Sequence, residues 1–518
     1  NKEKILVYGD YDVDGTTAVA MMYDFLKKIY SFHLKEHDLK NDNLIGFYIP
    51  DRDKEGYGIS FKGIDFASAN NFSLVIALDC GIKEIDKTDY AKKKGIDFII
   101  CDHHTPGEKI PNAVAVLDPK RPGCNYPYKE LSGCGIGFKL VQAFSQMHPH
   151  FASCIEQYLD LVVASIASDI VPITGENRIL AYFGLQRINN NPREGFRAMM
   201  ELNNIKKNLT VTDMVFVIGP RINAAGRMDS GRKAVELLFT SSAEKAMETG
   251  TYLNQINTNR KEIDSSITQQ AIEMIAKSPE LQNKKTTVLF NPQWHKGVIG
   301  IVASRLIETY YRPTIILTKS NEFVSGSARS VKGFDIYEAI TSCSDLLEHF
   351  GGHKYAAGVS LKQENIKKFI SRFEEVVSST IDEKLLTPEI AIDAVINFSD
   401  ITPNFYNVLK QFAPFGPGNM TPVFLTENVV DKGYVRIVGR NHLKMDLYQA
   451  AESSSDKQIT NQTIGISQPQ PIPAIAFDMG GHYLNVYKKT PFRICYNINQ
   501  HEWAGNSFLQ LNVKDMKW

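Results

Sequence analysis

Three carboxylates occupy alternate positions in one short polar segment of the chain. Asp10, Asp12 and Asp14 stand in the sequence GDYDVDG, directly after a short apolar run. In an extended chain alternate residues point to the same side, so these carboxylates would crowd together. Crowded, partly desolvated carboxylates resist ionisation, and a divalent cation removes that cost. The spacing therefore predicts a metal site, although an isolated Asp-x-Asp more often forms a turn.

Further carboxylates and imidazoles follow later apolar runs. Asp79 and the pair His103-His104 each come after such a run, and Asp169 stands in the segment ASDIVP, where a helix cap is the ordinary alternative. Each motif alone favours its ordinary alternative, but consecutive runs that all end in Asp or His favour a metal centre. Mixed carboxylates and imidazoles suit Mn²⁺, with Mg²⁺ as the alternative, and the chain has no thiolate set for structural zinc.

The elements that must position these residues alternate between strand and helix. Strands are predicted over 5–7, 74–78, 98–100 and 114–117, with helical patterns between them. This alternation predicts a parallel sheet, whose ligands bind at the carboxyl ends of the strands. The acidic and histidine residues fall at those ends, so the first third of the chain is predicted to be an α/β domain.

The 518 residues allow roughly three or four domains. We expect a catalytic domain over 1–250, a connecting helix over 251–283 and a second α/β domain over 284–384. Short strand-like runs separated by turn residues predict a small β-barrel over 385–518. Within it the polar segment 453–473 is predicted to be a mobile loop.

Composition narrows the class of protein further. The 58 basic and 58 acidic residues cancel, which argues weakly against general nucleic-acid binding but allows a local basic channel beside an acidic metal site. Seven cysteines without a C-x-x-C pair favour a reducing compartment, so a cytoplasmic location is expected. No run approaches the roughly 20 apolar residues of a membrane span. No stretch resembles a signal peptide, and what precedes Asn1 lies outside the sequence.

Four ordered motifs resemble those of the DHH phosphoesterase superfamily: DYDVDG, LDCG, DHH and SD, at 10–15, 78–81, 102–104 and 168–169. The resemblance implies two divalent metal ions, most often Mn²⁺, about 3.5–4 Å apart at the scissile phosphate. Implied metal ligands are Asp12, Asp14, Asp79, His103 and Asp169, with Asp79 between the two ions. Asp10 is implied either as a ligand or as a ligand's partner. His104 is expected to face the scissile phosphate as a catalytic residue, and Asp102 to orient the histidines.

Two more segments resemble the branch of this superfamily that degrades single-stranded DNA from its 5′ end. In IPDRDKEGYG, the implied roles are contact with the 5′-terminal phosphate for Arg52 and stacking or steric wedging for Tyr57. In GPRINAAGRM, the guanidinium groups of Arg221 and Arg227 suit phosphate recognition, and Asn223 would fix a loop or a phosphate.

The later segments resemble the same branch. WHKGVIG, SGSARS and GGHKYAAG match the DHH-associated domain, which is implied to form the other wall of the cleft and to grip phosphates through Ser327, Arg329 and His353. PFGPGNMTPVF and the β-rich sequence after it resemble an OB-like nucleic-acid-binding barrel. Candidate DNA contacts there are Tyr434, Arg436, Arg440, His442, Lys444 and Trp503. Such barrels combine a basic groove with aromatic stacking, and which of these residues touch DNA stays open.

The expected fold class is therefore α/β, a DHH parallel-sheet domain plus a second α/β domain, followed by an OB-like β-barrel. The resemblance implies a single-stranded-DNA-specific exonuclease that cuts 5′ to 3′ and releases 5′-mononucleotides in recombination and repair. The 5′-end pocket is expected around Arg52, Arg221 and Ser327. Expected partners are single-stranded DNA, a helicase and a single-strand binding protein; we expect no membrane and a monomer.

Three alternatives remain. A DHH oligoribonuclease or cyclic-dinucleotide phosphodiesterase would not need the C-terminal domain. A non-catalytic DHH relative that serves as a replication scaffold would have lost metal ligands, and here every acidic and histidine position is filled. A plain single-strand binding module would not need the ligand set.

Overall fold

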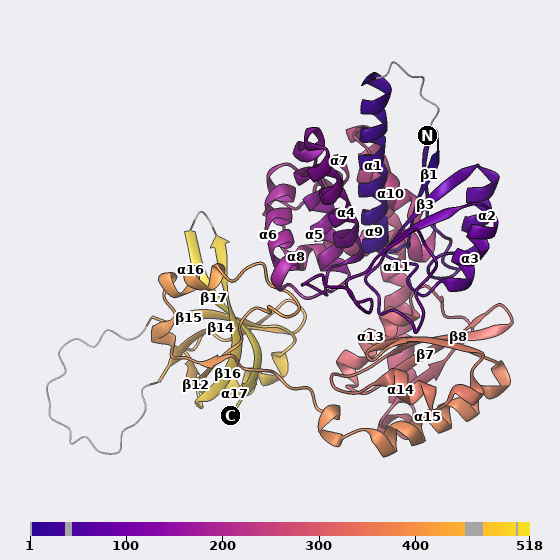
Figure 1. Ribbon diagram of the computed structural model, residues 1–518. Helices are drawn as coiled ribbons and strands as arrows, with labels where there is room; N and C mark the ends of the chain where they lie inside the picture. The colour runs from indigo at the N-terminus through magenta and orange to yellow at the C-terminus, as the bar shows by residue number, and fades with distance from the viewer. Residues whose placement is uncertain (1–2, 37–43, 451–469, 504–505) are drawn as a thin grey trace, which may run out of the picture. The chain divides into compact units, whose positions relative to one another are not determined.

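The chain divides into two units in a computed structural model (Figure 1). The first unit is Asn1–Pro388 and the second is Glu389–Trp518. The structure describes residues 3–36, 44–450, 470–503 and 506–518. Among these described residues, no helix has both the length and the apolarity that crossing a membrane requires.

Unit 1 begins with a five-stranded parallel sheet, called sheet A. Its strands are β1 (Lys4–Gly9), β2 (Ile45–Tyr48), β3 (Phe72–Leu78), β4 (Asp97–Cys101) and β5 (Ala115–Leu117). The order β2-β1-β3-β4-β5 means that the chain builds outward in opposite directions from β1 and β3. Such a reversal leaves a crevice outside the carboxyl ends of these two strands, where ligands of α/β sheets bind. The four predicted strands are confirmed, and β2 is a strand that the sequence reading missed.

Both faces of sheet A are buried, which explains the nearly unbroken apolar runs of its strands. Leu6 and Tyr8 pack on one face with α2 (Phe61–Ala69) and α3 (Ile85–Lys93). Val7 points to the other face, where α1 (Val13–Glu36) and α4 (Gly133–Met147) cover it. Figure 1 shows these two helix pairs on opposite sides of the sheet.

A helical region follows sheet A and shares its core. Its helices are α5 (Leu159–Ser168), α6 (Gly175–Asn190), α7 (Glu194–Leu202), α8 (Val211–Asp213), α9 (Gly219–Met228) and α10 (Gly231–Phe239). A π-helical turn, Met214–Ile218, joins α8 to α9. The 34-residue helix α11 (Ala243–Ala276) then spans about 51 Å. Leu253 in its first half packs in the core of this region, and Ile267 in its second half packs in the next one.

Sheet B forms the second part of unit 1. Its strands are β6 (Thr287–Phe290), β7 (Thr314–Ser320), β8 (Phe323–Arg329), β9 (His349–His353) and β10 (Ala356–Leu361), in the order β6-β7-β8-β10-β9. Helices α14 (Ile336–Thr341) and α15 (Ile366–Thr380) bury one face. On the other face, α11 and α13 (Ile299–Thr309) cover β6 and β7. The short helix α12 (Pro279–Asn283) leads into the sheet. The prediction placed the connecting helix at 251–283; this and the other domain boundaries inside unit 1 stay predictions.

Unit 2 is a small β-barrel. Its strands are β11 (Ala394–Val395), β12 (Phe424–Asp431), β13 (Arg436–Val438), β14 (His442–Gln449), β15 (Ile472–Ala476), β16 (Phe492–Trp503) and β17 (Asn506–Lys517), with short helices α16 (Pro403–Lys410) and α17 (Tyr483–Tyr487). Because β12 pairs with both β16 and β14, the strands β12, β16, β17, β15 and β14 close on themselves. The barrel predicted from the sequence is therefore confirmed. Most of the predicted loop 453–473 lies outside the described residues.

Candidate active site

Three of the predicted metal ligands meet because neighbouring parallel strands end at the same edge. Asp10 follows β1, Asp79 follows β3, and His103 lies just beyond β4. The Nε2 atom of His103 is 3.2 Å from an oxygen of Asp79. Asp79 has a φ of 60°, the left-handed conformation that aspartate tolerates better than most residues. Backbone strain of this kind is concentrated at functional sites.

The remaining acidic residues complete the cluster. Asp12 and Asp14 come from the turn into α1 and its first turn, and Asp169 caps the carboxyl end of α5. The Nε2 atom of His103 lies 3.5 Å from Asp169 and 3.8 Å from Asp14. Three sets have ligand atoms within 4.8 Å of one another: Asp79, His103 and His104; Asp14, His103 and Asp169; Asp10, Asp12 and Asp79. Asp79 and His103 each belong to two sets, so the three sets form one connected cluster of candidate ligands.

The cluster is buried and only partly satisfied by the protein. Both carboxylate oxygens of Asp10, one oxygen of Asp79 and both ring nitrogens of His103 have no hydrogen-bond partner among the described residues. Burial, then repulsion from neighbouring carboxylates, raises the pKa of Asp10, Asp79 and Asp169 well above the usual range. Burial likewise lowers the pKa of His103. Unpartnered buried groups of this kind are costly, and a divalent cation would satisfy them, so the donor set fits such an ion.

Asp14 is held by the amino end of α4. Its carboxylate accepts the backbone N–H groups of Gly133 at 2.7 Å and Cys134 at 2.6 Å, and the hydroxyl of Ser165 at 2.7 Å. These three donors fix the position of the Asp14 carboxylate at the start of α4. A side chain at position 133 is excluded, because its Cβ would lie 2.5 Å from that of Asp79. The sequence reasoning missed this anchor, although the segment LSGCG carries a helix-capping serine.

The aspartate of the DHH motif orients the second histidine. Asp102 accepts the Nδ1–H of His104 at 2.7 Å and the backbone N–H groups of His103 at 2.7 Å and Ile82 at 2.9 Å. Burial raises the pKa of Asp102, but its bond to His104, the charge of His104 and the N–H of Ile82 together outweigh burial and bring the pKa down to about 2. Burial opposes protonation of His104, yet the Asp102 partner raises its pKa. The Nε2 atom of His104 faces the hydroxyl of Tyr57, 2.9 Å away.

A groove rich in arginine lies beside this cluster. Arg52, Arg227, Arg329 and Ser327 line a cavity of about 740 Å³, and none of the described residues that line it is acidic. Burial, then the charges of Arg52 and Arg329, lowers the pKa of Arg227 to about 10. Arg227 also donates to the carbonyl of Gly297 at 3.2 Å, which ties α9 to the second part of unit 1. Crowded guanidinium groups without carboxylates are suited to an anion such as phosphate.

Arg221 is placed differently from the other arginines. Its guanidinium donates to the side-chain oxygen of Asn254 at 2.8 Å, to the side chain of Asn203 and to the carbonyl of Val217. It does not line the arginine groove. Three of the five guanidinium N–H groups of Arg221 are used within the protein, and its place in the expected 5′-end pocket with Arg52 and Ser327 stays a prediction.

Asn223 and His353 both make hydrogen bonds within the protein. The side-chain oxygen of Asn223 accepts the backbone N–H of Val13 at 3.1 Å, so Asn223 fixes the start of α1 beside the carboxylates. His353 lies on β9, cross-strand from Ala356. Its Nδ1 accepts the N–H of Tyr355 at 3.3 Å. Burial, then the nearby charge of Arg329, lowers its pKa. Phosphate contacts by these two residues stay predictions.

Unit 2 presents basic and aromatic side chains on one part of its barrel. Arg436 and Lys444 are cross-strand partners on β13 and β14. His442 lies beside Phe477, with ring centroids 5.1 Å apart. The side chain of Trp503 lies outside the described residues. Cations next to aromatic rings suit single-stranded nucleic acid, and these contacts stay predictions.

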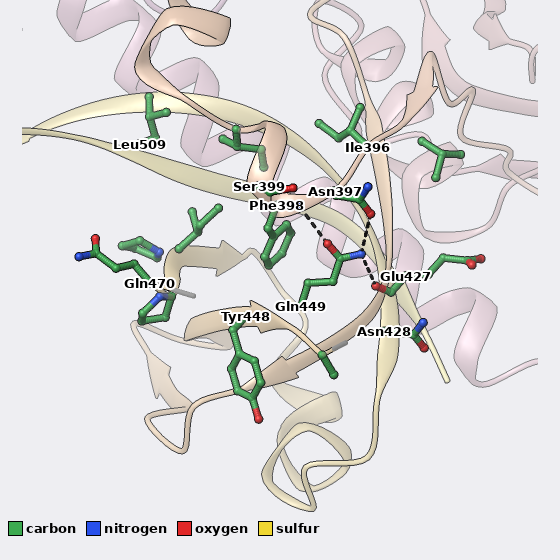
Figure 2. Close-up of a pocket in the computed structure, with 16 residues that line it drawn as sticks. Ile396, Asn397, Phe398, Ser399, Glu427, Asn428, Tyr448, Gln449, Gln470 and Leu509 are labelled. Carbon is green, nitrogen blue, oxygen red and sulfur yellow. Dashed lines mark hydrogen bonds between the residues drawn. The ribbon is translucent and has the colours of Figure 1, made fainter. Parts of the chain in front are cut away.

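The large hollow of unit 2 has a different chemical character (Figure 2). Its volume is about 1080 Å³, and Glu427 is the one charged residue among the described residues that line it. Gln449 accepts the N–H of Phe398 at 3.0 Å and donates to the side chain of Asn397 at 3.0 Å and the carbonyl of Glu427 at 3.2 Å. Figure 2 shows these bonds along its wall. Among the described residues that line it, the hollow offers no cation to a phosphate.

Comparison with known proteins agrees with this arrangement. Models described as DHH family N-terminal domain, DHHA1 domain and RecJ OB domain match residues 4–166, 283–379, and 392–459 with 450–515. A parallel sheet with an acidic and histidine cluster at its carboxyl edge, followed by a DHHA1 domain, places the chain in the DHH class.

The relatives narrow the class further. The chain is 34% identical to the single-stranded-DNA-specific exonuclease RecJ of Bacillus subtilis, over 99% of this chain and 61% of that protein. It is 32% identical to the RecJ exonuclease of Haemophilus influenzae, over 99% and 87%. The crystal structure of RecJ in complex with Mn²⁺ from Thermus thermophilus superposes with a TM-score of 0.80 at 25% identity, over 100% and 69%. The chain belongs to the RecJ family. It spans less than two thirds of the Bacillus subtilis relative.

Proposed function

We propose that this chain hydrolyses single-stranded DNA from its 5′ end and releases 5′-mononucleotides, with two divalent metal ions, Mn²⁺ in preference to Mg²⁺. One observation carries the proposal. A buried cluster of carboxylates with unpartnered oxygens adjoins an arginine groove, and the described residues that line this groove include no carboxylate. The phosphate backbone of a nucleic acid, together with divalent cations, would satisfy both at once.

The metal-binding residues would be Asp10, Asp12, Asp14, Asp79, His103 and Asp169. Bound divalent ions supply Lewis acidity, which activates water and offsets negative charge at the phosphate. Asp79 would lie between the two ions, since its ligand atoms belong to two of the three sets. The backbone N–H groups of Gly133 and Cys134 keep Asp14 in one orientation, which preorganises the site before an ion arrives.

His104 would hold a proton beside the scissile phosphate. Its Nδ1–H is fixed by Asp102, which leaves Nε2 directed to Tyr57 and the site. The negative charge of Asp102 favours the imidazolium form, which would stabilise charge on the reacting phosphate. Tyr57 is half exposed at this point and would meet the terminal base or wedge the strand.

Arg52, Arg227, Arg329 and Ser327 would hold the 5′-terminal phosphate. They line one groove, next to the acidic cluster, so a strand whose end is fixed there presents its first phosphodiester to the metals. A guanidinium offers a planar fork of donors that matches phosphate oxygens. Fixing the 5′ end in this way accounts for the polarity.

An enzyme restricted to single strands needs another protein to expose them. A helicase and a single-strand binding protein are therefore the partners we propose, in recombination and repair. The proposed state of the enzyme itself is a monomer.

The function is tested with Mn²⁺ and single-stranded DNA labelled at either the 5′ or the 3′ end. We expect the 5′ label to be released at once as a mononucleotide, and this release to be lost in Asp79→Asn. Turnover of dinucleotides to pentanucleotides without degradation of long DNA would instead place the chain with the small-substrate enzymes. Equal cleavage of duplex and single strands would contradict the proposed steric selection.

A further inference from the structure

The arginine groove continues beyond the residues assigned to the 5′-terminal phosphate. On sheet B, Gly358 of β10 pairs with Ser327 and Gly351, and Ser360 pairs with Ser325 and His349. Alternate residues of a strand share a face and lie about 6.7 Å apart, so these are two successive rows on one open face. Both rows line the groove. The second row leads away from the arginines and the metal cluster.

The second row offers hydrogen-bond donors that no other described residue uses. The hydroxyl groups of Ser325 and Ser360 have no hydrogen-bond partner among the described residues, and neither does the imidazole of His349. The ammonium group of Lys296 is exposed and likewise has no ion pair in the part of the chain that the structure describes. Lys296, Ser325 and Ser360 line both the arginine groove and an adjoining hollow of about 460 Å³.

The floor of the groove is open because it lacks side chains. A Cβ placed on Gly351 would meet no atom within 4 Å, and one placed on Gly358 would meet its nearest at 4.0 Å. The acidic residue that lines the adjoining hollow is Glu322, next to Phe323 at the start of β8. A further anion therefore has room and hydrogen-bond donors as far as Glu322. The negative charge of Glu322 would repel an anion beyond that residue.

We infer that this extension takes the outer phosphates of a single strand that carries a 5′-triphosphate. The inference rests on the proposed function, since it needs the first phosphate of the end to sit at Arg227 and Arg329. A terminal monophosphate leaves Lys296, Ser325 and Ser360 without a ligand, whereas a triphosphate reaches them. Hydrogen bonds from these donors to a charged phosphate would be stronger than hydrogen bonds between neutral groups.

The reaction on such an end keeps its triphosphate intact. Water attacks the first phosphodiester, and the bond from that phosphorus to the 3′ oxygen of the terminal nucleotide breaks. The 3′ oxygen takes up a proton, and the terminal nucleotide leaves as a nucleoside triphosphate. The shortened strand keeps the attacked phosphate as its new 5′-monophosphate.

The test uses one oligodeoxynucleotide made with a 5′-hydroxyl, 5′-monophosphate or 5′-triphosphate end. With Mn²⁺ we expect the triphosphate strand to be degraded at least as fast as the monophosphate strand, with a nucleoside triphosphate as its first product. In EDTA, fluorescence anisotropy should show tighter binding of the triphosphate strand. Lys296→Ala and Ser360→Asp should each lower the triphosphate-to-monophosphate ratio of kcat/KM by about tenfold, and Lys319→Ala, exposed on the same sheet outside the groove, should not.

Two results overturn the inference in different ways. If the monophosphate strand is degraded but the triphosphate strand is slower than the hydroxyl strand, the groove ends at the first phosphate and the proposed function stands. If the monophosphate strand is not degraded at all, the proposed function fails and the inference fails with it. If Lys296→Ala lowers kcat/KM equally on the triphosphate and monophosphate strands, that result would also contradict a separate site for the outer phosphates.

Discussion

The carboxyl edge of sheet A and the open face of sheet B carry buried charge of opposite sign. Asp10 and Asp79 have unpartnered oxygens at the first, and Arg227 and Arg329 crowd together at the second. Among the described residues, no ion pair joins the two groups of side chains. Their charges are therefore left for ligands: cations at the acidic edge, and the anionic end of a strand at the basic groove. The two regions differ in what they bind. We therefore expect substitutions at the acidic edge to lower the catalytic rate, and substitutions at the basic groove to lower the preference for a 5′-phosphorylated end.

The largest effect is expected at the acidic edge. Asp79→Asn removes the carboxylate shared by two ligand sets, so Mn²⁺-dependent release of mononucleotides should fall more than about 100-fold. Losing even a partner of a metal ligand commonly costs 10- to 100-fold. The rate of product release under saturating Mn²⁺ measures this loss. Asp97→Asn, exposed at the opposite end of β4, is the control and should retain the wild-type rate.

At the basic groove, Arg227→Ala removes a charged donor from the 5′ end. We expect kcat/KM on 5′-phosphorylated strands to fall about 10- to 100-fold, since hydrogen bonds to charged groups contribute about 1.5–3 kcal/mol. The preference over 5′-hydroxyl strands should be lost at the same time. Arg232→Ala, which removes an exposed arginine side chain on α10, serves as the matched control. An unchanged preference in Arg227→Ala would remove this arginine from the 5′-end pocket.

A smaller effect is expected at the orienting aspartate. Asp102 raises the pKa of His104 against the opposing effect of burial. If the imidazolium form is the active one, activity falls as pH rises through that pKa. Asp102→Asn should lower the pKa of His104, so the alkaline limb of the pH–rate profile should move to lower pH, with about a tenfold loss of rate. A profile that keeps its shape would mean that His104 does not titrate in catalysis.

The smallest effect concerns stability. The folded-state pKa values of Asp10, Asp79 and Asp169 are raised, so in EDTA their contribution to stability is fully present below the unfolded value near 3.9 and is lost as pH rises through the folded values. Mn²⁺ should offset that loss. The thermal midpoint should therefore rise with Mn²⁺ by about 2–4 °C more at pH 8 than at pH 5.5. In Asp79→Asn this pH dependence should shrink; a metal-induced rise that is equal at both pH values would argue against a buried acidic site.

The metal cluster could be predicted from the sequence because each strand and the residue that follows it can be recognised locally. Asp10, Asp79 and His103 each follow an apolar run, and parallel strands carry their carboxyl ends to one edge. The groups that hydrogen-bond to this part of the chain could not be predicted in the same way. The N–H groups that hold Asp14 come from the start of α4, more than a hundred residues away, and the amide that holds the start of α1 comes from Asn223.

The arginines illustrate a second limit. Arg221 and Arg227 stand six residues apart in α9, which places them about 240° apart around the helix at 3.6 residues per turn. Only Arg227 lines the groove. The motif GPRINAAGRM identifies both arginines by residue type alone, and residue type does not say which side of a helix each one faces. The two rows of paired residues on the open face of sheet B could not be predicted for a related reason. The segments SGSARS and GGHKYAAG are recognisable as motifs, but their sequences do not show which of their residues pair across strands.

The difference between the two regions is tested most directly by one binding measurement. In EDTA, the affinity for a 5′-phosphorylated single strand is divided by that for the 5′-hydroxyl strand, in wild type, Asp79→Asn and Arg227→Ala. We predict that Asp79→Asn keeps the wild-type ratio and that Arg227→Ala brings it close to one. A ratio lost in Asp79→Asn, or kept in Arg227→Ala, would contradict the assignment of chemistry to the acidic edge and of end recognition to the basic groove.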